Sequence, residues 1–208
     1  MRSLLLKRLY LEIVSRRHGY LPDWGKTFSR ERDAWNNALK SAKGGANILI
    51  ATNTGGHVPS STLESLLAVA LTLRGANVHV MLCDEALPAC LLCTVGLYPD
   101  HKQFVRYGPN RDACKGCYRP ASRMYRSLGL TVHRFSELLV PEDEERAESV
   151  SASLPFADIP GYTMDGLSLG EHALAGALRF YARGDLEGQK YAEPILRRYL
   201  KAAILTAC

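Results

Sequence analysis

The pattern between residues 47 and 84 constrains the fold more than any other part of the chain. Residues 47–52 form a short, continuous apolar run, which is typical of a strand buried on both faces. Residues 59–73 then place leucine and alanine at helical spacing until Arg74-Gly75 ends them, and residues 77–83 form a second apolar run. A strand, a helix and a strand in such close succession predict a βαβ unit, and hence a parallel sheet with helices on both faces.

We expect the chain to fold as an α/β protein around this unit. A Rossmann-like domain with flanking helices is predicted over residues 44–208, after a helical N-terminal extension over residues 1–43. Within the domain we expect a cysteine-bearing insert over residues 85–120 and a closing pair of helices over residues 168–207. The smaller expected elements are helices over 29–43, 85–93 and 118–128, a strand over 130–133, and an acidic helix or linker over 141–153.

The net charge of +5 is concentrated near the amino terminus, because residues 1–43 carry ten Lys or Arg and four Asp or Glu. Basicity this local, without base-reading groups gathered on one face, argues against a nucleic-acid partner. No apolar run reaches 18 residues, and Lys7-Arg8 interrupts the leucines at 4–6 too early for a signal peptide. We therefore expect a cytoplasmic protein.

Residues 3–17 have the pattern of a basic amphipathic helix, with an apolar stripe flanked by arginine and lysine. Such a helix either packs on its own domain or on a partner, or it lies at an anionic lipid surface. Peripheral contact with the inner membrane face is therefore one of two interpretations of this segment.

Two cysteine pairs, Cys90/Cys93 and Cys114/Cys117, are separated by twenty residues. Two residues between ligands let one turn present both thiolates to one metal ion, and Gly116 suits a tight second turn. Four thiolates complete a tetrahedral site with no open position, so the predicted ion is a structural zinc. An iron–sulfur cluster uses the same ligands, and four unrelated buried thiols are the third interpretation.

The segment Asn-Thr-Gly-Gly-His at residues 53–57 lies between the first strand and the helix, where ligands bind in open α/β sheets. Its glycines let backbone N–H groups approach a ligand, and the helix amino terminus favours negative charge. The third glycine and the acidic residue of the dinucleotide fingerprint are missing, so a nicotinamide cofactor is not expected. His57 is either a general base or a solvated loop histidine.

The segment from Asn47 to Asp84, with Thr-Gly-Gly-His after the first strand and Leu-Arg-Gly-Ala after the helix, resembles the amino-terminal half of GT-B glycosyltransferases. Its Thr-Gly-Gly-His motif is similar to that of the lipid-linked N-acetylglucosaminyl transferases of peptidoglycan synthesis. The remaining chain, with the cysteine pairs and Gly-Glu-His at residues 170–172, resembles bacterial capsular or surface polysaccharide biosynthesis proteins.

This resemblance implies the acceptor-side part of a glycosyltransferase in surface polysaccharide or glycolipid biosynthesis. His57 would take a proton from the acceptor hydroxyl, and the partner of this part would be a sugar or a lipid-linked acceptor. The candidate substrate-binding residues lie in the loop and at the start of a later helix: Asn53, Thr54, Gly55, Gly56, Glu171 and His172.

A GT-B enzyme also needs a second domain, whose helix amino terminus binds the donor diphosphate, and we expect no room for it within 208 residues. The nucleotide-sugar donor is therefore expected to bind only through a second domain or subunit. The alternatives are a non-catalytic, metal-stabilised module for binding or assembly, and an iron–sulfur protein with a redox or sensing role.

Two later motifs have structural interpretations. Ser168-Leu-Gly-Glu171 has the form of a capping box, which leaves His172 unexplained. Arg197-Arg198 is expected on a solvated basic face, with contact to phosphate or lipid headgroups as the alternative.

Overall fold

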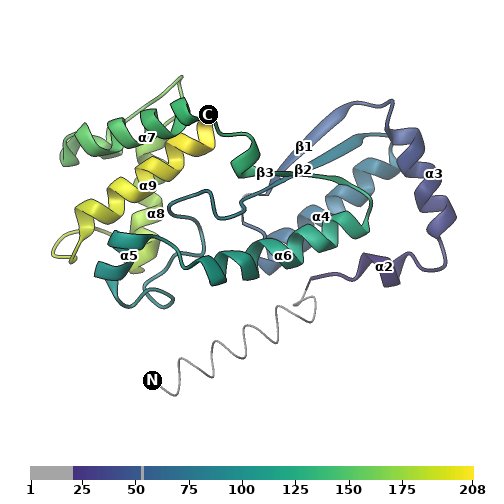
Figure 1. Ribbon diagram of the computed structural model, residues 1–208, viewed down its shortest axis with the longest axis horizontal. Helices are drawn as coiled ribbons and strands as arrows, with labels where there is room; N and C mark the ends of the chain where they lie inside the picture. Colours follow the sequence, from purple (N-terminus) through teal and green to yellow (C-terminus); the bar gives the residue numbers. More distant parts are fainter. Residues whose placement is uncertain (1–20, 53) are drawn as a thin grey trace, which may run out of the picture. The chain divides into compact units, whose positions relative to one another are not determined.

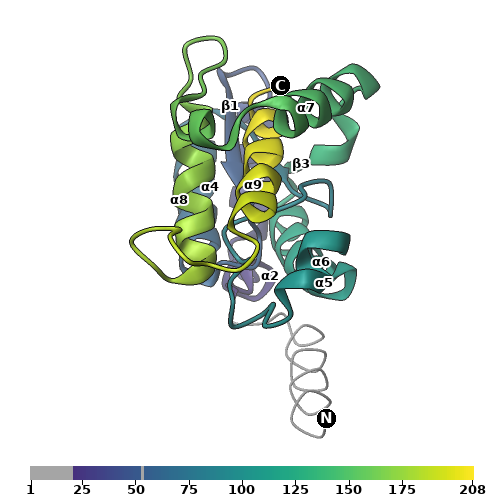
Figure 2. The ribbon, with the colours of Figure 1, turned by 90° about the vertical axis from the view of Figure 1, so that its left-hand side faces the viewer.

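Figures 1 and 2 show the computed structural model from two sides; it describes residues 21–52 and 54–208. The expected amphipathic helix over residues 3–17 and the candidate residue Asn53 lie outside this part of the chain. The chain divides into two compact units. Unit 1 holds the described residues up to Asp84 together with Asp112–Glu137, and unit 2 holds Glu85–Arg111 together with Leu138–Cys208.

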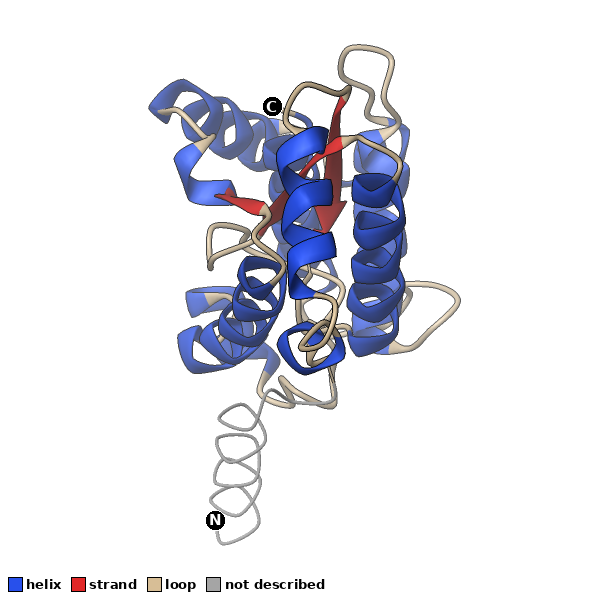
Figure 3. Ribbon diagram, turned by 90° about the vertical axis from the view of Figure 1, so that its right-hand side faces the viewer, coloured by secondary structure: helices blue, strands red, loops and turns tan. Residues whose placement is uncertain are grey.

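Unit 1 is built on a parallel sheet, as the two apolar runs predicted. Its strands are β1 (Asn47–Thr52), β2 (Asn77–Leu82) and β3 (Thr131–Arg134), in the order β1-β2-β3 (Figure 3). All strand pairs are parallel, and Asn47 pairs with Asn77 at the start of the ladder. The α/β class and the βαβ unit are therefore confirmed.

Three helices pack against this sheet: α3 (Arg32–Ala42), α4 (Val58–Leu73) and α6 (Arg111–Ser127). A short helix α2 (Trp24–Thr27) precedes them, and a 3-10 turn η1 (Phe135–Glu137) follows β3. The core of unit 1 includes Trp35, Ile50, Ala68, Val69, Val78, Val80, Leu82, Ala121, Met124 and Tyr125. The indole of Trp35 donates to the carbonyl of Leu128 (2.9 Å), which ties α3 to the end of α6.

Helices flank the sheet, but within unit 1 they pack on one face. Ile50, Val80 and Leu82 point into the core with α4 and α6, whereas Leu49 on the opposite face is 54% exposed. Because both crossovers run in the same direction along the order β1-β2-β3, right-handed connections place both helices on the same side. The expectation of helices on both faces is therefore wrong for unit 1.

Polar side chains line the opposite face of the sheet. The side-chain amide of Asn77 donates to Oδ1 of Asn47 (2.7 Å) and lies 2.9 Å from Nε2 of His79. Nδ1 of His79 lies 2.9 Å from Nε2 of His133, and the two rings stack with centroids 5.1 Å apart. This ladder of side chains crosses all three strands.

Unit 2 is helical, and its closing helical pair is confirmed. It contains α5 (His101–Tyr107), α7 (Pro141–Ser153), the 3-10 turn η2 (Phe156–Gly161), α8 (Leu169–Tyr181) and α9 (Ala192–Ala207). Helices α8 and α9 pack so closely that a Cβ on Gly176 would lie 2.3 Å from Cδ1 of Tyr199. In the described part of the chain, no helix has the length and apolarity needed to cross a membrane.

Three local predictions are wrong. Residues 85–93 form turns rather than a helix, because Glu85 has a positive φ of 83° and Pro88 lacks an N–H. Helix α6 begins at Arg111, so Gly116 lies within a helix and not in a tight turn. Ser168 is the N-cap residue of α8, but its side chain makes no capping hydrogen bond.

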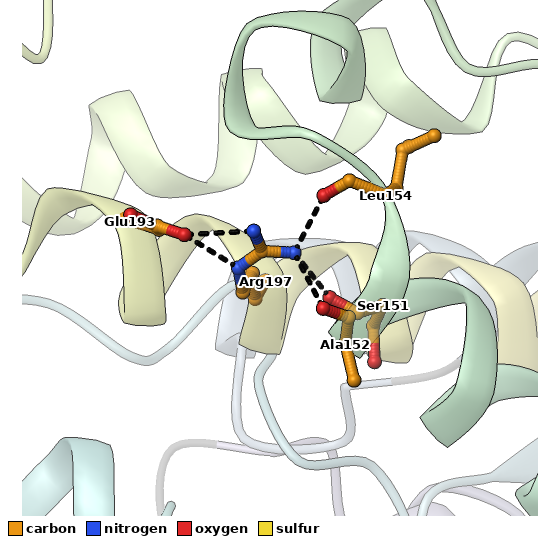
Figure 4. Close-up of polar contacts among 5 residues, drawn as sticks. All are labelled: Ser151, Ala152, Leu154, Glu193 and Arg197. Atoms are coloured by element: carbon orange, nitrogen blue, oxygen red, sulfur yellow. Dashed lines mark hydrogen bonds and ion pairs between the residues drawn. The ribbon is translucent and has the colours of Figure 1, made fainter.

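The expectation of a solvated basic face at Arg197-Arg198 is also wrong, because both guanidinium groups bind backbone carbonyls within unit 2. Arg197 donates to the carbonyls of Ser151 (2.7 Å) and Leu154 (2.8 Å) and pairs with the Glu193 carboxylate (2.7 Å), as Figure 4 shows. Arg198 donates to the carbonyl of Val105 (2.6 Å). The two side chains therefore hold unit 2 together.

Candidate functional site

The loop of residues 54–57 lies in unit 1 at the carboxyl end of β1 and the amino end of α4. Gly55 is buried against α6, and a Cβ at this position would lie 2.5 Å from Cβ of Ala121 and 3.0 Å from the carbonyl oxygen of Cys117. Both atoms belong to a packed helix that cannot withdraw easily, so the loop can approach α6 only with a glycine at this point.

Hydrogen bonds from two helices fix this loop. The backbone N–H of Gly56 donates to Sγ of Cys117 on α6 (2.9 Å). The hydroxyl of Ser61 on α4 donates to the carbonyl of Gly55 (3.0 Å), and the Tyr125 hydroxyl donates to the carbonyl of Ser61 (3.4 Å). The loop is therefore held in one conformation before any ligand arrives, as a preorganised site requires.

His57 is the N-cap residue of α4 and is half-buried. Its Nδ1 lies 2.8 Å from Oγ of Ser60, and no described residue makes a hydrogen bond to its Nε2. In the tautomer in which Nδ1–H donates to Ser60, Nε2 carries a lone pair that can accept a proton. This is the arrangement that a histidine base needs, with one ring nitrogen held and the other available.

Two residues near the loop, Ser60 and Tyr125, have roles that the sequence reasoning missed. Ser60 orients the imidazole of His57. Burial raises the pKa of Tyr125 to about 12, so its phenol is neutral and donates a hydrogen bond to the carbonyl of Ser61. Glu64 has one buried carboxylate oxygen without a hydrogen-bond partner among the described residues. Ser60 and Glu64 follow His57 by three and seven residues, a spacing that puts all three on one helix face and that the sequence displays.

The other predicted substrate-binding residues divide between the units. Thr54, Gly55 and Gly56 lie in the loop of unit 1, whereas Glu171 and His172 are exposed in the first turn of α8 in unit 2. Neither unit by itself brings the two groups together. The hypothesis that Glu171 or His172 contacts the ligand stays a prediction.

A depression of about 320 Å³ is present in unit 1, but not at this loop. It lies where β2 and β3 begin, and its lining includes Asn36, Asn77 and Thr131. It holds no candidate nucleophile or base from the sequence analysis. The chemistry of the loop therefore does not depend on this depression.

The first cysteine pair lies in unit 2, on a turn between β2 and α5. Sγ of Cys90 and Sγ of Cys93 are 3.7 Å apart. The hydrogen bond from the Cys93 thiol lowers the pKa of Cys90 to about 6; backbone N–H groups and the charge of Arg179 act in the same direction, while burial opposes them. Cys90 therefore ionises well below the pH at which an ordinary thiol does.

The second pair, Cys114 and Cys117, lies on α6 in unit 1, one helical turn apart. Among the described residues, no group of three or more His, Cys, Asp or Glu side chains is arranged to hold a metal ion. The predicted four-thiolate set takes two residues from each unit. Zinc and the iron–sulfur alternative therefore stay predictions.

Comparison of the chain with protein-family models, with curated proteins and with solved structures found no match.

Proposed function

We propose that unit 1 is the acceptor-binding part of a glycosyltransferase for a surface polysaccharide or glycolipid, with His57 as its general base. The observation that carries the proposal is the placement of His57 at the start of α4, with Nδ1 held by Ser60 (2.8 Å) beside a glycine loop at the carboxyl end of β1. That edge of a parallel sheet is where ligands of open α/β folds bind.

In the proposed reaction, Nε2 of His57 removes the proton from an acceptor hydroxyl as its oxygen attacks the anomeric carbon of the donor sugar. The bond from that carbon to the nucleoside diphosphate breaks, and the diphosphate leaves with the bonding electrons. The amino terminus of α4 favours the negative charge that develops on the acceptor oxygen. A second domain or subunit supplies the donor site.

The apolar surface of unit 1 supports assembly with such a partner. Four leucines of α4 are about half exposed or more, and Leu63 reaches 69%. The residues are Leu63, Leu66, Leu67 and Leu73. Exposed apolar side chains gathered on one helix are typical of a protein interface.

The same surface favours the second candidate function, a non-catalytic module that assembles with an enzyme. The two candidates differ in one respect, since only the first requires a sugar acceptor to bind at the loop. An acceptor-binding measurement on the full chain therefore separates them. A cytoplasmic location, with the acceptor at the inner membrane face, is part of the first proposal.

The test is saturation-transfer NMR on the full chain, with a panel of short-chain lipid-linked sugars and, separately, nucleotide sugars. We expect transfer from the protein to at least one lipid-linked sugar, and none to the nucleotide sugars. His57→Ala should retain this binding, because a base acts mainly in the transition state. In an assembly that carries out transfer, His57→Ala should lower turnover about 10²–10⁴-fold.

Ser60→Ala is the matched variant, because it leaves the imidazole in place and removes the group that orients it. It should lower turnover less than His57→Ala does. Binding of nucleotide sugars alone, or of no sugar, would reject the acceptor-side assignment and favour the assembly module. Unchanged turnover in His57→Ala would reject His57 as the base.

A further inference from the structure

We propose that Cys90 and Cys93 form a redox-active dithiol that closes to a disulfide on reaction with a disulfide-containing molecule. Their sulfurs are 3.7 Å apart, which is a non-bonded contact, and bonding requires an approach to about 2.05 Å. The proposal is independent of the sugar transfer proposed for unit 1.

The turn between the two cysteines has a backbone compatible with this bond. The N–H of Cys93 donates to the carbonyl of Cys90 (3.0 Å), which closes a four-residue turn. In such a turn the terminal Cα atoms lie less than about 7 Å apart, and a disulfide spans about 4.4–6.8 Å between Cα atoms. Side-chain rotation with a small backbone adjustment is therefore enough to form the bond.

The two thiols differ in access, as an attacking and a resolving thiol must. Cys93 is buried and only 1% exposed, whereas Cys90 is partly exposed. An external disulfide therefore meets Cys90 first. Cys93, in contact with the sulfur of Cys90, is placed for the second step and is shielded from the external molecule.

Unit 2 anchors this turn through its backbone. The hydroxyl of Tyr199 on α9 donates to the carbonyl of Cys93 (2.9 Å) and lies 3.3 Å from that of Cys90. The guanidinium of Arg179 on α8 lies 3.5 Å from the same Cys90 carbonyl. These contacts involve the carbonyls and not the sulfurs, so closing the disulfide does not require them to break.

The reaction is a thiol–disulfide exchange. The Cys90 thiolate attacks one sulfur of a disulfide RS–SR, that bond breaks, and one thiolate RS⁻ leaves. The Cys93 thiolate then attacks the Cys90 sulfur of the mixed disulfide, and the second RS⁻ leaves as the Cys90–Cys93 bond forms. Two electrons pass to the external disulfide, and the two protons of the dithiol pass to the departing thiolates.

The test uses the full chain carrying Cys114→Ser and Cys117→Ser, which keeps the dithiol and removes half of the predicted metal-ligand set. The protein is treated with EDTA and equilibrated with mixtures of glutathione and glutathione disulfide. It is then unfolded in guanidinium chloride that contains N-ethylmaleimide, so that buried thiols are alkylated too, and its mass is measured by mass spectrometry. We expect protein from the oxidising mixtures to carry two fewer maleimide adducts per chain than reduced protein. Both missing adducts should be those of the peptide that contains residues 90–93. In the same background, Cys93→Ala should stop at a glutathione adduct on Cys90.

Two results would overturn the proposal. In the first, both cysteines remain alkylated in the most oxidising mixture; in the second, glutathione stays on Cys90 although Cys93 is present. Circular dichroism of the reduced variant checks that it folds. If it does not fold, peptide mapping of the unsubstituted chain decides whether oxidation links Cys90 to Cys93 or to another cysteine.

Discussion

The backbone N–H of Gly56 donates a hydrogen bond to the sulfur of Cys117, 2.9 Å away on α6. This contact joins the glycine loop to a helix 61 residues further along the chain. It gives Cys117 a role within unit 1, whatever else the sulfur binds. The conformation of the loop that carries His57 therefore depends on α6 as well as on β1 and α4.

The first prediction tests this contact. Cys117→Ala leaves the partly buried N–H of Gly56 without its partner, so we expect a loss of about 1 kcal/mol of unfolding free energy. Hydrogen exchange of residues 54–57 should speed up more than exchange of the β2 amides, because the loop is affected first. Urea unfolding and hydrogen-exchange mass spectrometry on EDTA-treated protein measure both effects. Unchanged hydrogen exchange of residues 54–57 in Cys117→Ala would contradict a stabilising hydrogen bond from Gly56 to Cys117.

The second prediction concerns the packing of Gly55. Gly55→Ala places a methyl group 2.5 Å from Cβ of Ala121, so we expect a destabilisation of about 1–3 kcal/mol in urea unfolding. Gly116→Ala is the matched control, since nothing lies within 4 Å of its added Cβ and its backbone is helical. That substitution should stabilise the chain by about 0.5–1 kcal/mol. Equal effects of the two substitutions would argue against the close approach of the loop to α6.

The third prediction concerns metal. The predicted four-thiolate site is the alternative to the Cys90–Cys93 dithiol, because the same two sulfurs cannot serve both at once. It requires one ion per chain on Cys90, Cys93, Cys114 and Cys117, found by elemental analysis of anaerobically purified protein. A colourless zinc protein and a brown iron–sulfur protein are distinguished by their absorption spectra. Because a closed thiolate site contributes folding free energy, chelation or Cys114→Ser should lower the unfolding midpoint. Metal-free protein at full stability would reject the four-thiolate site.

The fourth prediction concerns the pH dependence of Cys90. Because the folded-state pKa is lowered to about 6, reaction of Cys90 with iodoacetamide in metal-free protein should be half-maximal near pH 6. Cys208, whose pKa is raised by burial, should react only at alkaline pH. Cys93→Ala removes the largest cause of the shift and should move the Cys90 profile towards an ordinary thiol, near pH 8.5.

The same shift predicts how stability changes with pH. Cys90 is more acidic in the folded than in the unfolded chain, so its contribution to the free energy of unfolding is fully present above about pH 8.5. The contribution falls as the pH drops and is lost below about pH 6. Urea unfolding of the parent and of Cys90→Ser across this range measures it, and parallel curves for the two proteins would contradict it.

Elements whose signal is local could be predicted from the sequence. The strands β1 and β2 and the helices α4, α8 and α9 each combine an apolar pattern with a clear boundary residue, such as Gly75 with its positive φ of 88°. Their existence depends on neighbours in the sequence, and the structure confirms them. The position of the loop after β1 could also be predicted, because only these residues lie between the predicted strand and the predicted helix.

Elements that depend on distant packing could not be predicted. Pro120 and Gly116 favour a break in α6, yet Ala121, Met124 and Tyr125 are buried in the core and stabilise the helix through both positions. The bond from Gly56 to Cys117 joins segments that no sequence pattern connects. The spacing of the cysteines identifies the two pairs. It does not reveal that one pair lies on a turn and the other on a helix.

The contacts of Arg197 determine how the end of α7 and the start of α9 unfold. Its guanidinium donates hydrogen bonds to three carbonyls at the end of α7, those of Ser151, Ala152 and Leu154. It also donates to the carboxylate of Glu193 in the first turn of α9. The last turn of α7 therefore cannot fray without releasing a cation that the start of α9 also holds. These two helix ends should lose their amide protection in a single cooperative step, although about 40 residues separate them along the chain.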